Sequence, residues 1–192
     1  RPDRTPSSWA ASVKPIEIPA PTDAARPTSS VVLGSWVAKA VAKIGAIVLP
    51  MFSGFGADAI TQRLNDGRAV ALITVDGSLR RGKPVSAKPV VDDALKQCPG
   101  VRHVVVLNHL TTRHGWTAGR DHWWHELASG APDDFTAVPT EPMPADDPFL
   151  LMFTSGTSGK PKGVVHSHCG FPVKTALDLS ICMDLKPSDR FL

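Results

Sequence analysis

From Ser30 onward, hydrophobic residues alternate between helical spacing and short continuous runs. Apolar side chains that recur every three or four residues predict amphipathic helices, and they do so at residues 31–45, 57–66 and 87–97. Short apolar runs between turn residues predict buried strands, and such runs stand at residues 46–52, 69–75 and 102–107. Because helices and strands alternate strictly, the pattern predicts an α/β fold with a largely parallel sheet and flanking helices.

The second half of the chain follows a less regular pattern. Residues 108–147 are polar and proline-rich, with one short helix expected at residues 121–128. Residues 148–153 then predict a buried strand, 163–166 a second short strand, and 167–182 a helix. The polar, glycine-rich segment between these two strands is expected to be a loop.

The first 29 residues differ from the rest of the chain. Six prolines lie among Ser, Thr, Ala and Arg, with no sustained apolar period. Proline lacks a backbone N–H and disrupts helices and central strands. This segment is therefore expected to be a loop or disordered.

Composition and charge narrow the class of protein. A hydrophobic content of 42% is enough for a packed core. The net charge of +3 comes without a dense basic stripe, so no nucleic-acid partner is expected. Three cysteines without metal-like spacing indicate reduced thiols and a cytoplasmic protein. Lys39 and Lys43 interrupt the apolar stretch 31–52, which favours an amphipathic helix followed by a strand over a membrane span.

One glycine-rich loop carries the most distinctive chemistry. Residues 154–163 combine four hydroxyl side chains, three glycines and two lysines. Hydroxyls and glycine N–H groups can surround a phosphate, and lysines add positive charge. The loop departs from a Walker A motif, because Thr154 stands where that motif needs its first glycine and Pro161 follows Lys160. A flexible surface hairpin is the alternative interpretation.

A second motif suggests a different function. "SGFGADA", residues 53–59, follows an apolar run, and Asp76 comes about twenty residues later, as in a dinucleotide-binding fingerprint. This interpretation predicts an NAD(P)-dependent oxidoreductase. Against it, Pro50 interrupts the strand before the glycines, and the loop at 154–163 stays unexplained.

The segment "HWWHE" lacks the histidine and glutamate spacing of known zinc motifs. Trp123 and Trp124 are expected to pack a helix, with His122 and His125 on its exposed side. We therefore expect no metal ion bound by the protein itself.

The stretch "FTSGTSGKPKGVVHSH", residues 153–168, resembles the signature loop of the adenylate-forming enzymes. In that family the loop grips the β- and γ-phosphates of ATP while a carboxylate attacks the α-phosphate. The resemblance implies a phosphate-holding role for Thr154, Ser155, Gly156, Thr157, Ser158, Gly159 and Lys160, with electrostatic help from Lys162.

A longer stretch, residues 43–85, resembles the acetyl- and propionyl-CoA synthetase branch of that family, and "GWTAGRDHWWHELA" and "EPMPADDPFLLMFTSG" agree with it. The resemblance implies that Arg80, Arg81 and Lys83 bind phosphates of coenzyme A and that Gly54 lies near its adenine. Arginine and lysine on a turn suit a phosphate monoester. A solvated basic turn is the alternative.

The resemblance extends over about residues 37–192 and implies a fragment of the large N-terminal domain of an adenylate-forming enzyme. Residues 1–36 do not resemble the family. The implied activity is that of an AMP-forming acid–CoA ligase that uses ATP, Mg²⁺, coenzyme A and a short-chain carboxylate. The family's Mg²⁺ ligands, catalytic lysine and C-terminal domain are expected beyond Leu192. No catalytic residue is thus expected here, and the fragment alone is expected to be inactive. The alternatives are the oxidoreductase or a non-catalytic nucleotide- or CoA-binding remnant.

Overall fold

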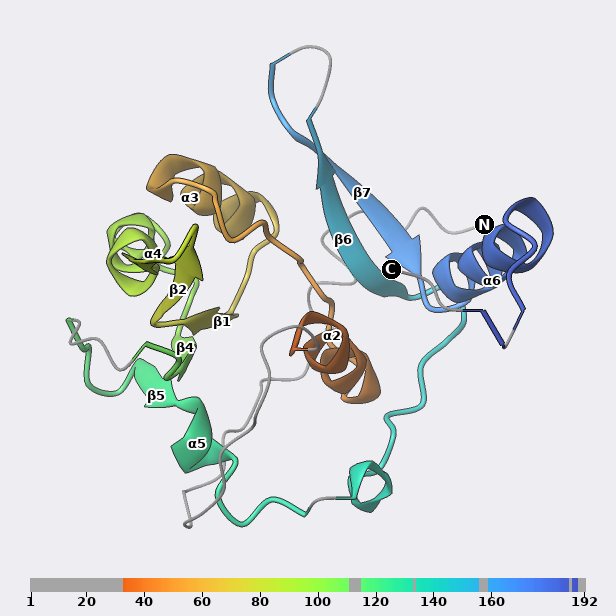
Figure 1. The fold of residues 1–192 in the computed structure, drawn as a ribbon, viewed down its shortest axis with the longest axis horizontal. Coiled ribbons are helices and arrows are strands. Elements are labelled where there is room, and N and C mark those ends of the chain that lie inside the picture. The colour runs from red at the N-terminus through yellow and green to blue at the C-terminus, as the bar shows by residue number, and fades with distance from the viewer. Residues whose placement is uncertain (1–32, 111–114, 133, 156–158, 187, 190–192) are drawn as a thin grey trace. The chain divides into compact units, whose positions relative to one another are not determined.

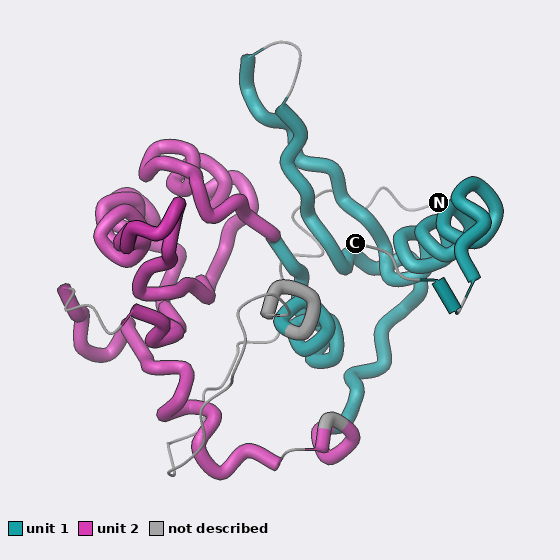
Figure 2. The backbone as a smooth tube through the Cα atoms, in the orientation of Figure 1, with its two compact units in different colours: residues 1–14, 33–49, 139–192 teal, residues 15–32, 50–138 magenta. Residues whose placement is uncertain are grey.

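The computed structural model describes residues 33–110, 115–132, 134–155, 159–186 and 188–189. The expectation of a loop over residues 1–29, and most of the segment 1–36, lie outside these ranges. The chain forms two compact units (Figure 2). Unit 1 contains residues 1–14, 33–49 and 139–192, and unit 2 contains residues 15–32 and 50–138.

Unit 2 is built around a three-stranded parallel sheet with the strand order β1-β4-β5 (Figure 1). Its elements in chain order are α3 (Ala57–Asp66), β1 (Ala71–Val75), β2 (Gly77–Arg80), β3 (Lys83–Ser86), α4 (Lys88–Leu95), β4 (His103–Leu107), β5 (Asp121–Trp123), α5 (Trp124–Leu127) and a short 3-10 turn, η1 (Phe135–Ala137). Residues of β1 pair in parallel with β4 from Ala71↔His103 to Val75↔Leu107. The predicted α/β fold with a parallel sheet and flanking helices is confirmed.

The core of unit 2 lies between this sheet and the helices α3 and α4. It joins apolar side chains of both helices, of β1 and β4, and of the connection between α4 and β4, namely Ile60, Leu64, Leu72, Val91, Ala94, Leu95, Cys98, Val101, Val104 and Val106. Continuous apolar strands are typical of parallel sheets that are covered by helices. The helix predicted over 57–66 coincides with α3 because its apolar positions face this core.

A β-hairpin inserted between β1 and α4 was not predicted. Its strands β2 and β3 pair antiparallel, from Gly77↔Ser86 to Arg80↔Lys83. Arg81 and Gly82 form the two-residue turn, with φ values of 50° and 75°. Two successive positive φ values give the turn the twist that a tight hairpin requires. The basic residues proposed for coenzyme A therefore lie at the tip of a hairpin.

Unit 1 combines helices with an antiparallel pair of strands. Its elements are α2 (Leu33–Lys43), β6 (Pro148–Thr154), β7 (Lys162–Ser167), α6 (Gly170–Leu177) and the π-helical turn η2 (Asp178–Cys182). Strands β6 and β7 form a hairpin paired from Pro148↔Ser167 to Thr154↔Lys162. The end of α2 is tied to the following segment, because Lys43 Nζ donates to Thr140 Oγ1 at 2.6 Å.

Several predicted elements need correction. The strand expected at 46–52 is reduced to one parallel bridge, Val48↔Leu150. The expected helix at 121–128 begins as strand β5 and becomes helical only at Trp124. Strand β6 was expected to be buried, but Leu150 is its only buried residue. Among the described residues, no helix is long and apolar enough to cross a bilayer.

Candidate functional site

The hydroxyl- and lysine-rich loop connects the ends of β6 and β7. Thr154 pairs with Lys162 across the two strands, and Thr154 Oγ1 donates to the Lys162 carbonyl oxygen at 3.3 Å. Thr154, Ser155, Lys160 and Lys162 are all exposed to solvent. Three of the predicted phosphate-holding residues, Gly156, Thr157 and Ser158, lie outside the described part of the chain.

Glycine has a specific reason to stand at position 159. Gly159 has a φ of +93°, and a Cβ there would meet no other atom. The left-handed backbone conformation, rather than lack of space, therefore disfavours other residues. This conformation turns the chain back toward β7, with Lys160 close behind. A surface hairpin and a phosphate-binding loop would both have this geometry. The concentration of hydrogen-bond donors and positive charge favours the phosphate-binding loop.

The second cluster of predicted residues lies around the β2–β3 hairpin. Arg80, Arg81 and Lys83 are exposed at and beside the turn. Gly54 belongs to the segment before α3, yet a Cβ on Gly54 would lie 2.8 Å from Arg80 Nη2. The structure therefore brings Gly54 and Arg80 together, although 26 positions separate them in the sequence. Three exposed cations on one short hairpin make a site suited to an anion.

Sequence reasoning missed one aromatic residue at this site. Phe52 is 63% exposed, and a Cβ on Gly54 would lie 2.5 Å from its ring. The Arg80 guanidinium lies 6.0 Å from the centre of the same ring. An exposed aromatic ring beside an arginine can stack on a planar base while the cation binds a phosphate. In the sequence, Phe52 belongs to an apolar run that predicts a buried strand, so an exposed ring beside Arg80 was not expected.

Asp76, the acid of the dinucleotide fingerprint, is buried and engaged by the backbone. Its Oδ1 accepts hydrogen bonds from the N–H groups of Gly77 at 2.8 Å, His109 at 2.8 Å and Leu110 at 3.0 Å. The side chain is fully buried. A ribose-binding acid must reach solvent to meet its ligand. The geometry of Asp76 therefore speaks against the dinucleotide-binding alternative.

A network of four charges, which the sequence analysis did not identify, lies at the start of α4, and two of its members, Lys88 and Asp121, are fully buried. Lys88 is fully buried, and its Nζ donates to Asp92 Oδ1 at 2.7 Å, to Asp121 Oδ2 at 2.9 Å and to the Gly115 carbonyl at 3.2 Å. Arg120 completes the network through Asp121 Oδ1 at 2.6 Å and Asp92 Oδ1 at 2.7 Å. Two cations and two anions neutralise one another, which is the condition for burying charge.

The network shifts the pKa values of two of its members. Burial on its own would raise the pKa of Asp121, but hydrogen bonds from Arg120 and Lys88 outweigh it and hold that pKa below its ordinary 3.8. The same bond with Asp121 raises the pKa of Arg120. Both groups are therefore held in their charged forms. This network links segment 115–121 to α4, and its role is structural.

The lowered pKa of Asp121 predicts a loss of stability in acid. A group with a depressed folded-state pKa stabilises the fold above its unfolded-state pKa, and that contribution disappears as the pH falls through the folded-state pKa. We expect the denaturant midpoint of unit 2 to fall between about pH 5 and about pH 2. The denaturant midpoint of Asp121→Asn should be lower than that of the unmodified chain at pH 5, and it should change less over this pH interval. The measurement is urea unfolding followed by tryptophan fluorescence, and equal pH dependence in both proteins would contradict the prediction.

Of the two tryptophans expected to pack a helix, only Trp124, at the start of α5, is helical, and it is half-buried. Trp123 lies in strand β5 and stacks on Trp116, with ring centres 4.4 Å apart. His125 is exposed as expected, but His122 is half-buried against His103, with ring centres 5.6 Å apart, so its expected exposure was wrong. Among the described residues, no three histidine, cysteine, aspartate or glutamate side chains gather as metal ligands do.

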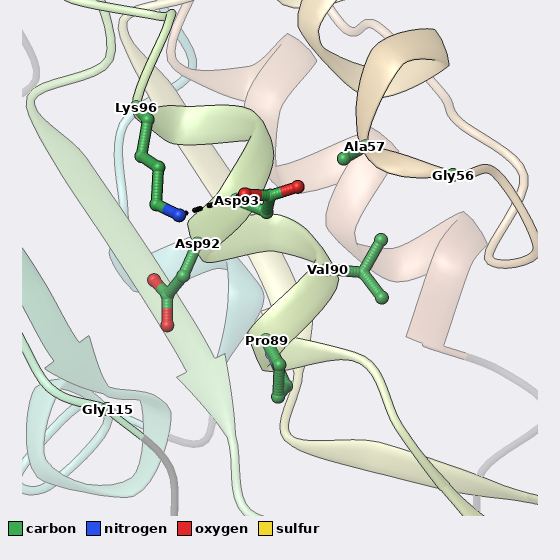
Figure 3. A pocket seen from close by; sticks show the side chains of 8 residues that line it. All are labelled: Gly56, Ala57, Pro89, Val90, Asp92, Asp93, Lys96 and Gly115. Carbon is green, nitrogen blue, oxygen red and sulfur yellow. Dashed lines mark hydrogen bonds and ion pairs between the residues drawn. The ribbon is translucent and has the colours of Figure 1, made fainter.

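An open hollow beside α4 lies within unit 2 (Figure 3). Its lining comes from the start of α3, from α4 and from the segment after β4, namely Gly56, Ala57, Pro89, Val90, Asp92, Asp93, Lys96 and Gly115. Its carboxylates are already paired, Asp92 with Lys88 and Arg120, and Asp93 with Lys96 at 2.9 Å. The hollow therefore adds no ligand-binding chemistry to the two clusters above.

An α/β fold with an exposed loop of hydroxyls, glycines and lysines fits an enzyme that binds nucleotide phosphates. The chain belongs to the AMP-binding enzyme family, whose model matches residues 36–192. It is 43% identical over 152 residues to an acetyl-coenzyme A synthetase of Coprinopsis cinerea, a match that covers 79% of this chain and 22% of the relative. It is also 43% identical over 148 residues to that of Streptomyces avermitilis, covering 77% of this chain and 22% of the relative.

A solved structure gives the same result. The acetoacetyl-CoA synthetase from Streptomyces lividans matches with a TM-score of 0.73 and 28% sequence identity, over 84% of this chain and 24% of that protein. The predicted resemblance to the adenylate-forming enzymes is confirmed. The chain spans about 22% of the length of the curated relatives that it matches.

Proposed function

We propose that the chain contributes the ATP-phosphate loop and part of the coenzyme A site of an AMP-forming acid–CoA ligase. The observation that carries the proposal is the exposure of Thr154, Ser155, Lys160 and Lys162 around one loop, in a chain whose residues 36–192 match the AMP-binding family. The oxidoreductase alternative is not favoured, since it explains neither this loop nor the buried position of Asp76.

The proposed reaction has two steps. In the first, a carboxylate oxygen attacks the α-phosphorus of ATP, the bond from that phosphorus to the β-phosphate oxygen breaks, and pyrophosphate leaves. In the second, the thiol of coenzyme A loses its proton and attacks the acyl carbon, and the bond from that carbon to AMP breaks. Negative charge accumulates on the leaving pyrophosphate during the first step, so fixed positive charge near it lowers the barrier.

The β6–β7 loop is suited to that first step. Hydroxyls of Thr154 and Ser155 can donate to phosphate oxygens, and the ammonium groups of Lys160 and Lys162 can neutralise them. Both lysines are exposed, so ligand can reach them. We propose that these residues, with Gly156, Thr157, Ser158 and Gly159, hold the β- and γ-phosphates.

The β2–β3 hairpin is suited to the second substrate. Arg80, Arg81 and Lys83 offer charge for the phosphates of coenzyme A, and Phe52 beside Gly54 offers a face for its adenine. We propose this division of roles between the two units. The β6–β7 loop belongs to unit 1, and the β2–β3 hairpin belongs to unit 2.

Mg²⁺ would enter with the phosphates of ATP, since the described residues contain no cluster of ligands for it. The small-molecule partners that we propose are a short-chain carboxylate, ATP with Mg²⁺, and coenzyme A. A cytoplasmic location is supported by the free thiols of Cys98, Cys169 and Cys182.

Activity is best tested in a family-length protein, because the chain spans about 22% of its curated relatives. In a chimeric synthetase, residues 36–192 of this chain replace the matching segment of the Streptomyces avermitilis enzyme. We expect the chimeric synthetase to form acyl-CoA from acetate or propionate. An inactive chimera, folded and assayed beside an active parent enzyme, would contradict the proposal.

Removing two of the three cations of the β2–β3 hairpin should affect the use of coenzyme A alone. In the chimeric synthetase, we expect Arg80→Ala with Lys83→Ala to weaken the apparent affinity for coenzyme A by about 1–3 kcal/mol, the usual cost of losing charged hydrogen bonds. Carboxylate-dependent pyrophosphate exchange should stay nearly unchanged, since that step does not use coenzyme A.

The two activities are measured separately, and dephospho-coenzyme A is compared with coenzyme A in each variant. A loss confined to coenzyme A would assign the hairpin to its 3′-phosphate, whereas equal losses with both would assign it to the diphosphate. If pyrophosphate exchange fell as far as thioester formation, the assignment of this hairpin would be wrong.

A further inference from the structure

We infer that Asp76 is a positioning residue for coenzyme A, which holds the β2–β3 hairpin so that Arg80, Arg81 and Lys83 meet the phosphates. The inference rests on the proposed function of that hairpin. Asp76 itself is fully buried, so we expect it to act on coenzyme A only through the hairpin. It acts through the backbone at the base of the hairpin, where its carboxylate accepts from the N–H groups of Gly77, His109 and Leu110.

The base of the hairpin converges on this one residue. The Asp76 carbonyl oxygen accepts hydrogen bonds from Ala87 N at 2.9 Å and Lys88 N at 3.2 Å, where the chain leaves the hairpin. Its carboxylate accepts from Gly77 N at 2.8 Å, where the chain enters. Both ends of the hairpin are thus fixed to Asp76.

The same carboxylate attaches the hairpin base to the sheet. Asp76 N donates to the Leu107 carbonyl at the end of β4 at 2.9 Å, and the carboxylate accepts from His109 N and Leu110 N just beyond. Above this base all four residues of β3 are exposed, and Arg80 lies beside Phe52 near the tip. The hydrogen bonds that fix the base of the hairpin to the sheet therefore meet at Asp76.

A carboxylate is suited to this task. Its two oxygens accept several N–H groups at once, and bonds from a charged acceptor are stronger than those from a neutral one. An asparagine has nearly the same shape, but its amide nitrogen would stand at the place of Oδ2, which accepts from Leu110 N at 3.1 Å. Two donors would then face each other, and the base of the hairpin would loosen.

Gly77 gives an independent way to disturb the same base. A Cβ at this position would lie 2.7 Å from the Val85 carbonyl oxygen and 2.8 Å from Leu110 Cδ1. Gly77→Ala must therefore move β3 away from β2 while every charge at the tip is kept. Asp93→Asn is a matched control, because Asp93 is an exposed carboxylate on α4 that pairs with Lys96 on the surface.

The experiment uses the 192-residue chain, with hydrogen–deuterium exchange of backbone amides and binding of coenzyme A followed by calorimetry. For Asp76→Asn and for Gly77→Ala, we expect faster exchange confined to residues 77–88 and to the amides of His109 and Leu110, which also contact this base. We also expect a roughly tenfold weaker affinity, as for the loss of one charged hydrogen bond. Asp93→Asn should match the unmodified chain in both measurements.

Unchanged exchange at residues 77–88, or unchanged affinity for coenzyme A, in Asp76→Asn would overturn the inference. Faster exchange throughout unit 2 would overturn it as well, because Asp76 would then support the fold in general. Failure of the proposed function would give a different result. Coenzyme A would then bind equally well to the unmodified chain and to the variant with Arg80→Ala and Lys83→Ala, or it would bind to neither of them. That result would remove the coenzyme A site, and with it the role of Asp76 in binding.

Discussion

Replacing Lys88 with methionine is expected to lower the free energy of unfolding of unit 2 by about 3–5 kcal/mol, the usual cost of removing one partner from a buried ion pair. Methionine keeps most of the side-chain length but none of the charge. Asp121, whose side chain is fully buried, would keep Arg120 and lose the bond from Lys88 at 2.9 Å. The carboxylates of Asp92 and Asp121 would then outnumber the remaining cation.

The measurement is urea unfolding followed by the fluorescence of the Trp116 and Trp123 pair, which lies beside this network. Lys96→Met is the matched control. Lys96 pairs with Asp93 on the surface, with 74% of its side chain exposed, so its replacement should cost less than about 1 kcal/mol. Equal effects of the two substitutions would show that the buried network does not stabilise the fold.

Replacing Lys160 with alanine is expected to slow carboxylate-dependent pyrophosphate exchange in the chimeric synthetase by about 100- to 1,000-fold, the effect of removing one group that stabilises transition-state charge. Lys160 directly follows the left-handed turn at Gly159, in a loop with no other basic residue than Lys162. The loss should fall on the turnover rate more than on the KM for the carboxylate, since the carboxylate does not contact this loop in the proposed reaction.

Lys174→Ala is the matched control for that experiment. Lys174 is a lysine of α6 in the same unit, with 70% of its side chain exposed, and it pairs with Asp178 at the start of η2. Its replacement should leave exchange within about twofold of the unmodified chimera, as for most surface substitutions. Comparable losses in the two variants would indicate that Lys160 is a surface residue without a role in the reaction.

Much of the fold could be predicted because its signals are local. Helix α3 was predicted at its observed bounds, since apolar spacing directly reflects one buried helix face. The hairpin β2–β3 was missed because every residue of β3 is exposed, so no alternation of apolar residues marks it. The strand expected at 46–52 is almost absent for a related reason. An apolar run predicts burial, but a strand also needs a partner strand to pair with, and within this run only Val48 forms a bridge, to Leu150.

The candidate site, too, could be predicted from the sequence only in part. The phosphate loop was visible in the sequence because its hydroxyls, glycines and lysines are consecutive. The approach of Phe52 to Arg80 depends on the fold, as does the burial of Lys88. Lysine is almost never fully buried without a partner, and the partner Asp121 lies 33 positions away. Composition and spacing cannot reveal such pairs.

The products formed from ATP test the central claim most directly. The chimeric synthetase is incubated with ATP, Mg²⁺, coenzyme A and acetate or propionate, and the phosphorus-containing products are identified by ³¹P NMR. The proposed function predicts AMP, pyrophosphate and acyl-CoA in equal amounts, all dependent on the carboxylate. Formation of ADP and phosphate, or no consumption of ATP while the parent enzyme is active, would contradict it.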